Sequence, residues 1–170
     1  MPANVYHFVT PWFIAGATLD DVWPLVSDAS TFPAWWGAVF LGVEKQADGD
    51  PTTGIGARYR YHTRGYLPYH LYWTAEVTAI EPRQFIEITA NGDFNGVGRW
   101  TLEQRGNAVT ATLDWDIVAD QSFIKRFAWL LNPLFAWNHQ WAMRQGERGM
   151  IMHLGHRKLF GDTANGAQQA

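Results

Sequence analysis

The chain has 170 residues, a formal net charge of -3, no cysteine, and 15% aromatic residues that include ten Trp and ten Phe. This length fits one folded domain around one core. The lack of cysteine excludes disulfides, zinc-thiolate sites, iron-sulfur clusters and a thiol nucleophile. The charge balance offers no basic cluster for phosphates, so nucleic acid is not an expected partner.

The N-terminal part of the chain predicts one strand followed by short helices. Residues 5–17 alternate and are rich in aromatic and β-branched side chains, which is typical of a strand. Thr18 is a candidate N-cap with Asp21 at the capping-box position, which predicts a short helix over residues 18–28. Residues 29–39 predict a second turn or short helix.

The middle of the chain predicts further strands, and its end predicts a helix. Strand candidates occupy residues 39–45, 55–64, 69–80, 84–90, 94–104 and 108–118. Short turns between them favour an antiparallel meander. Residues 122–158 have a helical pattern with a break at Asn132 and Pro133. The sequence therefore predicts an α+β fold, in which a curved seven-stranded antiparallel sheet wraps around a long C-terminal helix, with two short helices after the first strand.

Alternation predicts which strand side chains face this helix. In residues 109–117 the odd-numbered positions are apolar and the even-numbered ones are polar. The same alternation in the other strands predicts an inner wall that is rich in aromatic rings. Its large members are Tyr59, Tyr61, Trp73, Trp100 and Trp115.

The C-terminal helix predicts an unusual inner face. At about 100° per residue its charged side chains gather on one side, opposite Asn138, His139, Ala142, Gly146 and Gly149. Glycine inside a helix costs roughly 0.8 to 1 kcal/mol relative to alanine, so the two glycines need another reason. They either allow the helix to lie tightly on the sheet or leave space for a cavity. We favour the cavity, with Asn138 and His139 as its closest polar groups.

Motifs for catalysis are weak. Candidate acids or bases are His139, Tyr61, Tyr72 and Arg99, but no nucleophile elbow of the form G-x-S-x-G is present, and we assign no catalytic residue. The histidines form no HxH pair, so no metal site is expected. The glycine-rich segments at residues 54–60 and 96–100 lead into strands rather than helices, and no cofactor is expected.

Targeting signals and membrane spans are not evident. The first residues lack a positively charged region ahead of an apolar core, so we expect a cytoplasmic protein. The most apolar run, residues 127–137, is shorter than the ~20 residues that span a bilayer. We expect one domain over residues 1–160 and a disordered tail over residues 161–170, with the oligomeric state, monomer or homodimer, left open.

Several segments, in this order and spacing, resemble the START-like, or SRPBCC, superfamily of helix-grip proteins, and within it the polyketide cyclase/dehydrase and lipid-transport group. They are "FPAWWGAV", "DPTTGIGARYRY", "YLPYHLYW", "GVGRWTLE" and "NHQWAMRQGERG". The resemblance covers Tyr6 to about Lys158 and implies a deep cavity between sheet and helix, which in relatives holds lipids, sterols, plant hormones or polyketides. Some members are aromatases or cyclases and many only bind or carry. Catalytic residues are not shared between branches, so the resemblance assigns none.

Two hypotheses follow for function. A carrier or sequestering protein needs only an apolar cavity with one or two polar anchors, whereas a cyclase-type enzyme also needs an acid or base at the substrate. We favour binding of a hydrophobic small molecule such as a lipid, polyketide or aromatic metabolite. The expected ligand contacts are Tyr59, Tyr61, Trp73, Trp100, Trp115, Asn138, His139, Ala142, Gly146 and Gly149. An exposed patch of Trp12, Trp35 and Trp36 for a protein partner is a third interpretation, although we expect Trp35 and Trp36 at the cavity mouth.

Overall fold

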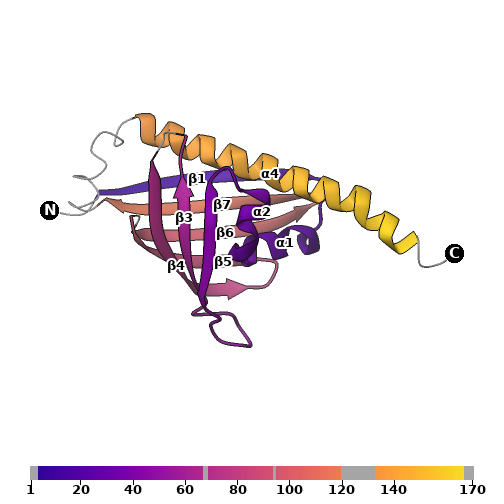
Figure 1. The fold of residues 1–170 in the computed structure, drawn as a ribbon, viewed down its shortest axis with the longest axis horizontal. Helices are drawn as coiled ribbons and strands as arrows, with labels where there is room; N and C mark the ends of the chain where they lie inside the picture. The colour runs from indigo at the N-terminus through magenta and orange to yellow at the C-terminus, as the bar shows by residue number, and fades with distance from the viewer. Residues whose placement is uncertain (1–3, 67–68, 94, 120–132, 167–170) are drawn as a thin grey trace.

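The structure, a computed structural model, describes residues 4–66, 69–93, 95–119 and 133–166 (Figure 1). In this part of the chain the strands form one antiparallel sheet of seven, in the order β1-β7-β6-β5-β4-β3-β2. They are β1 (Asn4–Ala15), β2 (Phe40–Ala47), β3 (Arg58–Arg64), β4 (His70–Glu81), β5 (Phe85–Gly92), β6 (Gly96–Arg105) and β7 (Ala108–Ala119). Strands β2 to β7 pair in sequence, as their short turns predict, and β1 pairs with β7.

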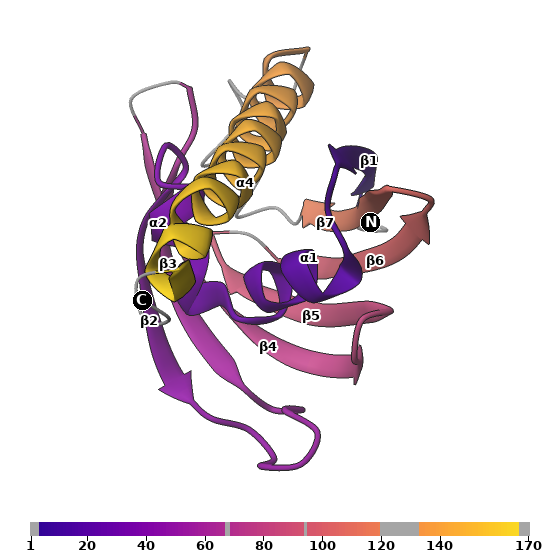
Figure 2. The ribbon, with the colours of Figure 1, turned by 90° about the vertical axis from the view of Figure 1, so that its right-hand side faces the viewer.

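The helices lie on the concave side of this sheet. They are α1 (Leu19–Ser27), η1 (Ala29–Thr31), α2 (Phe32–Trp35) and α4 (Pro133–Gly166). Figure 2 shows the sheet curving from β2 round to β1, with α4 lying across its open side. The fold class predicted from the sequence is confirmed, while the part of the expected terminal helix before Pro133 lies outside the described residues.

Helix α1 begins at the predicted capping box. The Asp21 backbone N–H donates to the Thr18 hydroxyl at 3.3 Å, and the Asp21 carboxylate accepts from the Thr18 backbone N–H at 2.8 Å. The hydrogen bond from the Thr18 backbone lowers the pKa of the Asp21 carboxyl. These bonds satisfy donors that the first helical turn would otherwise leave free, so they fix where the chain turns from β1 into α1.

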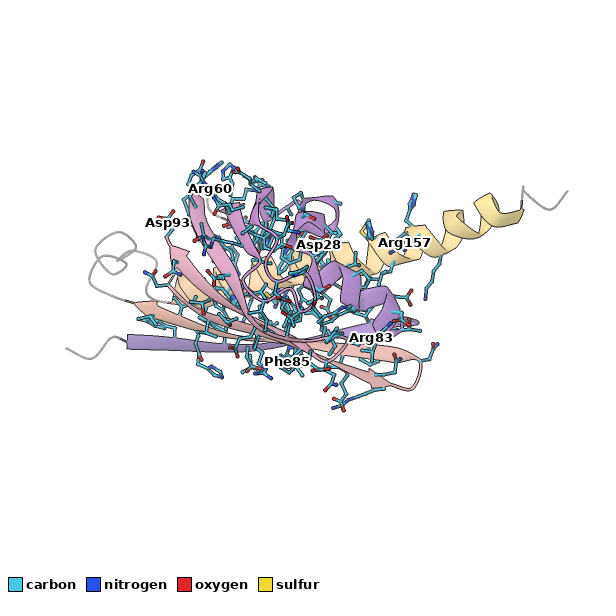
Figure 3. The ribbon with its side chains drawn as sticks, turned by 90° about the horizontal axis from the view of Figure 1, so that it is seen from below. Asp28, Arg60, Arg83, Phe85, Asp93 and Arg157 are labelled. Atoms are coloured by element: carbon cyan, nitrogen blue, oxygen red, sulfur yellow. The ribbon has the colours of Figure 1, made fainter. Side chains whose placement is uncertain are left out.

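The alternation predicted for the strands is confirmed. In β3 Tyr59 and Tyr61 are buried and Arg58 and Arg60 are exposed. Figure 3 shows Arg60 at the periphery of the molecule, as its parity requires. The five large aromatic side chains expected on the inner wall are all buried: Tyr59, Tyr61, Trp73, Trp100 and Trp115. The concave face of the sheet is therefore an aromatic surface.

Helix α4 is fixed to the rest of the fold by polar contacts from two sides. The Trp36 indole N–H donates to the Ala142 carbonyl oxygen at 2.9 Å. The Phe13 backbone N–H donates to the Glu147 carboxylate at 3.0 Å. Because Trp36 follows α2 and Phe13 lies on β1, these bonds join α4 to both edges of the concave side.

The C-terminal end of α4 differs from the sequence prediction. The helical pattern ends near Lys158, but the structure continues the helix to Gly166. Residues 161–166, whose composition predicts disorder, are thus helical in the structure. Figure 1 shows the last turns extending beyond the edge of the sheet.

The three tryptophans considered as an exposed patch are buried. Trp12 is 1% exposed, and Trp35 and Trp36 are each 5% exposed. Trp12 packs against both rings, with centroids 6.2 and 5.1 Å away, and against Trp100 at 4.7 Å. The partner-binding interpretation of this cluster is therefore wrong, because these indoles form the core between β1, α2 and α4 rather than a surface.

Candidate functional site

A pocket of about 150 Å³ lies between the concave face of the sheet and α4. Strands β3 to β7, the segment from α1 to β2, and the N-terminal half of α4 all contribute to its wall. Among the described residues that line the pocket, Arg64 alone has a charged side chain at neutral pH. Its side chain is exposed, and its Nε donates to the Ala38 carbonyl oxygen at 3.0 Å. The wall formed by these residues is thus apolar and aromatic.

Eight of the ten residues expected to contact a ligand line this pocket. They are Tyr59, Tyr61, Trp73, Trp100, Trp115, Asn138, His139 and Ala142. Residues separated by up to 83 positions are brought together because strand parity and helix periodicity both turn them toward the same space. Their contact with a ligand stays a prediction.

Gly146 and Gly149 do not line the pocket, and the space expected beside them is absent. A Cβ atom on Gly146 would lie 2.5 Å from the Trp36 ring and 2.6 Å from the Trp12 ring. A Cβ atom on Gly149 would overlap the backbone carbonyl group of Trp35. The sequence-based preference for a cavity at these two positions is therefore wrong. The glycines allow close packing of α4 against Trp12 and the α2 segment, and the pocket lies further toward the N-terminus of α4.

Tyr61 places a hydroxyl group among the rings of the pocket. Its side chain is 3% exposed and stacks on Trp73, with ring centroids 4.3 Å apart and planes inclined by 25°. The Phe40 ring packs edge-on against the Tyr61 ring, with centroids 5.5 Å apart. Burial raises the pKa of the Tyr61 phenol, so the hydroxyl stays protonated at neutral pH. No described residue forms a hydrogen bond with it, although buried hydroxyls normally have a partner.

The neighbouring polar groups on the sheet have partners. The Trp73 indole N–H donates to the buried Thr63 hydroxyl at 3.1 Å. The Tyr59 hydroxyl lies 3.5 Å from the Asp28 carboxylate, and burial raises the pKa of the Tyr59 phenol. These contacts hold both rings in place on the wall, and they distinguish Tyr61 from its neighbours.

Asn138 closes the end of the pocket near the β3–β4 connection. Its side chain is 8% exposed, and its Oδ1 accepts from the Tyr66 backbone N–H at 2.8 Å. Because an N–H group needs an acceptor, the amide atom that faces the Tyr66 N–H must be the oxygen. The nitrogen, Nδ2, therefore lies at the other end of the amide. No described residue accepts from Nδ2. A Cβ atom on Gly65 would lie 2.7 Å from Nδ2, so glycine at that position leaves room for the amide.

His139 lies on the adjacent part of the wall as a neutral group. Its Nε2 is 3.2 Å from the Thr10 hydroxyl, and its ring stacks on Phe8 with centroids 4.5 Å apart. Burial lowers the pKa of His139 to about 4, so the imidazole carries no charge at pH 7. A neutral imidazole fits an apolar wall, and its hydrogen bond to Thr10 gives it a structural role in the absence of a ligand.

Several lining residues were not predicted as ligand contacts. Phe32, Trp36 and Phe40 close one side of the pocket, and Met143 adds to the α4 wall. The sequence places the segment around Trp36 near the cavity mouth, but the turn between α2 and β2 has no periodicity from which ring directions could be read. Met143 shares the inner helix face with Ala142, so the helix periodicity could have identified it.

The remaining polar clusters of the described residues lie outside the pocket. His62 and His70 form a hydrogen bond of 2.6 Å on the outer face of β3 and β4. Among the described residues no three His, Asp or Glu side chains gather as they would around a metal ion. In the same part of the chain no helix is long and apolar enough to span a membrane.

The sequence matches a family of known proteins along most of its length. The model of the family described as polyketide cyclase/dehydrase and lipid transport matches residues 7–150. A comparison with curated proteins gives no match.

Solved structures share the fold at low sequence identity. The Zhui aromatase/cyclase from a Streptomyces species is 14% identical with a TM-score of 0.68, over 91% of this chain and 96% of its own. A START superfamily protein from Mycobacterium smegmatis is 12% identical with a TM-score of 0.68, over 89% and 97% of the two chains. Norcoclaurine synthase from Thalictrum flavum is 14% identical with a TM-score of 0.58, over 90% and 98%. At these identities the comparison establishes the fold alone.

Proposed function

Because this chain belongs to the polyketide cyclase/dehydrase and lipid transport family, we propose that it binds an apolar small molecule in the pocket under α4, as a carrier or sequestering protein. The observation that carries this proposal is the composition of the pocket wall. Of the described residues that line it, eight have aromatic side chains, and the one that is charged, Arg64, is exposed. Ligand sites in proteins have this character, with apolar walls and a few polar groups that orient the ligand.

The polar groups of the pocket favour binding over catalysis. None of the lining residues that the structure describes is Asp, Glu, Lys or Cys, so the acid and base candidates among them are His139, Tyr59 and Tyr61. The His139 imidazole has a pKa near 4, which makes it a weak base, and both tyrosines are held in the protonated form. Efficient proton transfer needs a group whose pKa lies near the working pH.

Native mass spectrometry of the protein purified from its own host tests the proposal. The expected result is an added mass of a small organic molecule that organic solvent removes. As a matched control, Ala142→Met should lose the added mass because the larger side chain enters the pocket, and Ala136→Met on the exposed side of α4 should keep it. Protein that is empty under every growth condition would contradict the proposal.

A cyclase-type enzyme is the second candidate, and one observation favours it: the neutral His139 imidazole lines the same pocket as the Tyr61 hydroxyl, which no described residue bonds. Two of the proteins with this fold are named as an aromatase/cyclase and a synthase. If the protein is an enzyme, the molecule released from it after incubation will differ in covalent structure from the one supplied. Liquid chromatography with mass spectrometry should find it unchanged if the protein is a carrier.

A further inference from the structure

We infer that Tyr61 and Asn138 make the pocket selective for a compact, neutral molecule with a hydrogen-bond acceptor oxygen, such as a ketone or ester carbonyl. This inference rests on the proposed function, since it names the ligand class of the same pocket. Two donor groups of buried side chains support it, the phenol of Tyr61 and the amide Nδ2 of Asn138, which line the pocket and find no acceptor among the described residues.

The Tyr61 hydroxyl has no partner among the described residues, and it opens onto the pocket rather than lying sealed in the wall. The apolar groups around it offer few acceptors for its hydrogen bond. The Tyr61 side chain is held between Trp73 and Phe40, so it cannot swing out to solvent. Its raised pKa keeps the proton on the oxygen, so the group presents a donor to the pocket. A ligand with an acceptor oxygen would satisfy it.

The other donor group belongs to Asn138. The Tyr66 backbone N–H occupies Oδ1, which leaves the NH₂ group as the free part of the amide. The side chain is 8% exposed and lines the pocket. The pocket therefore offers a second donor, from α4 rather than from the sheet. Two donors on opposite walls favour ligands whose polar atoms are acceptors.

The apolar wall limits the charge of the ligand. Moving an anion into an apolar site is costly unless a buried cation or several hydrogen bonds compensate it. In the part of the wall that the structure describes, Arg64 is the one charged residue, and it is exposed, with its Nε engaged by the Ala38 carbonyl. A carboxylate inside the pocket would therefore lack a buried counter-charge. The neutral form of the same skeleton avoids this cost.

The volume of the pocket limits the size of the ligand. A dry, apolar cavity of about 150 Å³ in another protein binds benzene, and this pocket has a volume of about 150 Å³. A single six-membered ring with a short carbonyl substituent matches that space. Acetophenone has this form, ethylbenzene has nearly the same shape without the oxygen, and benzoate is a charged counterpart.

Isothermal titration calorimetry with these three probes tests the inference on the full chain. Tyr61→Phe removes only the donor, and it should weaken acetophenone binding about fivefold to tenfold while leaving ethylbenzene unchanged. Tyr72→Phe, on the outer face of β4, should change neither affinity. Benzoate should bind the unmodified protein at least about tenfold more weakly than acetophenone.

The outcomes separate the inference from the proposed function. If both neutral probes bind and Tyr61→Phe affects them equally or not at all, the ligand class is wrong although the pocket still binds apolar molecules. Benzoate that binds as tightly as acetophenone would also overturn it. If neither neutral probe binds, both the inference and the proposed function fail. The infrared carbonyl stretch of bound acetophenone provides a readout without a variant: hydrogen bonding should lower its frequency relative to the probe in hexane, and an unshifted band would contradict the inference.

Discussion

The phenol ring of Tyr61 lies stacked on the indole of Trp73, 4.3 Å between centroids, and its hydroxyl has no hydrogen-bond partner among the described residues. The adjacent Trp73 N–H, in contrast, is bonded to Thr63. The Tyr61 oxygen faces the apolar pocket, where few groups can accept its hydrogen bond. We interpret it as a feature retained for ligand binding.

Removing this hydroxyl should stabilise the folded protein slightly. Tyr61→Phe keeps the stacked ring and removes a polar atom from an apolar pocket, so we expect the free energy of unfolding in urea to rise by up to about 1 kcal/mol. Tyr72→Phe removes a half-exposed hydroxyl and should change it by less than about 0.5 kcal/mol. A loss of stability in Tyr61→Phe would mean that the hydroxyl has a partner in the empty protein, such as a tightly bound water.

The close approach of α4 to the α2 segment predicts a contrast between two glycines. Gly149→Ala should lower the free energy of unfolding by about 2 to 3 kcal/mol, because its methyl group would overlap the Trp35 carbonyl. Gly155 lies in the same helix with no atom near its Cβ position, so Gly155→Ala should raise the free energy by about 0.5 to 1 kcal/mol. Thermal unfolding followed by circular dichroism measures both. Equal effects at the two positions would contradict the packing described for α4.

Because burial keeps the His139 imidazole neutral, the stability of the folded protein should depend on pH. Its pKa is about 4 in the folded protein and near 6.5 when exposed, so the unfolded chain binds more protons between these values. Stability should therefore fall as the pH drops from 6.5 toward 4, by up to about 3 kcal/mol from this residue. His139→Gln should flatten this part of the profile in urea unfolding. An unchanged slope in His139→Gln would show that the imidazole is not buried as a neutral group.

Replacing Asn138 should destabilise the backbone at Tyr66, at the start of the β3–β4 connection. Asn138→Leu removes the acceptor of the Tyr66 N–H and places an apolar group beside Gly65. We expect faster hydrogen exchange at the Tyr66 amide by about fivefold to tenfold, which corresponds to about 1 kcal/mol of local opening free energy. Gln140→Leu, on the exposed side of α4, should leave that amide unchanged. Equal exchange rates in both variants would remove Asn138 from its proposed role at the pocket end.

A larger side chain at Ala142 should weaken ligand binding, because it reduces the volume of the pocket. Ala142→Met adds three heavy atoms to a wall of a pocket of about 150 Å³, so binding of acetophenone should weaken by about tenfold or more. The same substitution at Ala136, which is exposed on α4, serves as the control and should leave the affinity unchanged. Equal affinities in the two variants would show that the probe binds elsewhere.

Most of the sheet could be predicted from the sequence because its signals are local. The two-residue period places Tyr59 and Tyr61 on one face and Arg58 and Arg60 on the other, and the structure agrees. Thr18 and Asp21 likewise mark the start of α1 through contacts three residues apart. Signals of this kind need no knowledge of distant parts of the chain.

The role of the glycines in α4 could not be predicted in this way. The helix period shows that Gly146 and Gly149 face inward, but it does not show which element lies opposite. That element is the segment of Trp35 and Trp36, more than 100 residues earlier in the chain. Whether a missing side chain leaves space or permits contact depends on this distant partner. For the same reason the sequence did not reveal that the Tyr61 hydroxyl has no hydrogen-bond partner among the described residues.

A crystal structure of the protein with acetophenone tests the central claim most directly. The account predicts density for the ring in the pocket between Trp73, Trp100 and Trp115, with the carbonyl oxygen about 2.7 Å from the Tyr61 hydroxyl oxygen. Crystals that hold acetophenone only at sites outside this pocket, with the pocket itself empty at saturating probe, would contradict it.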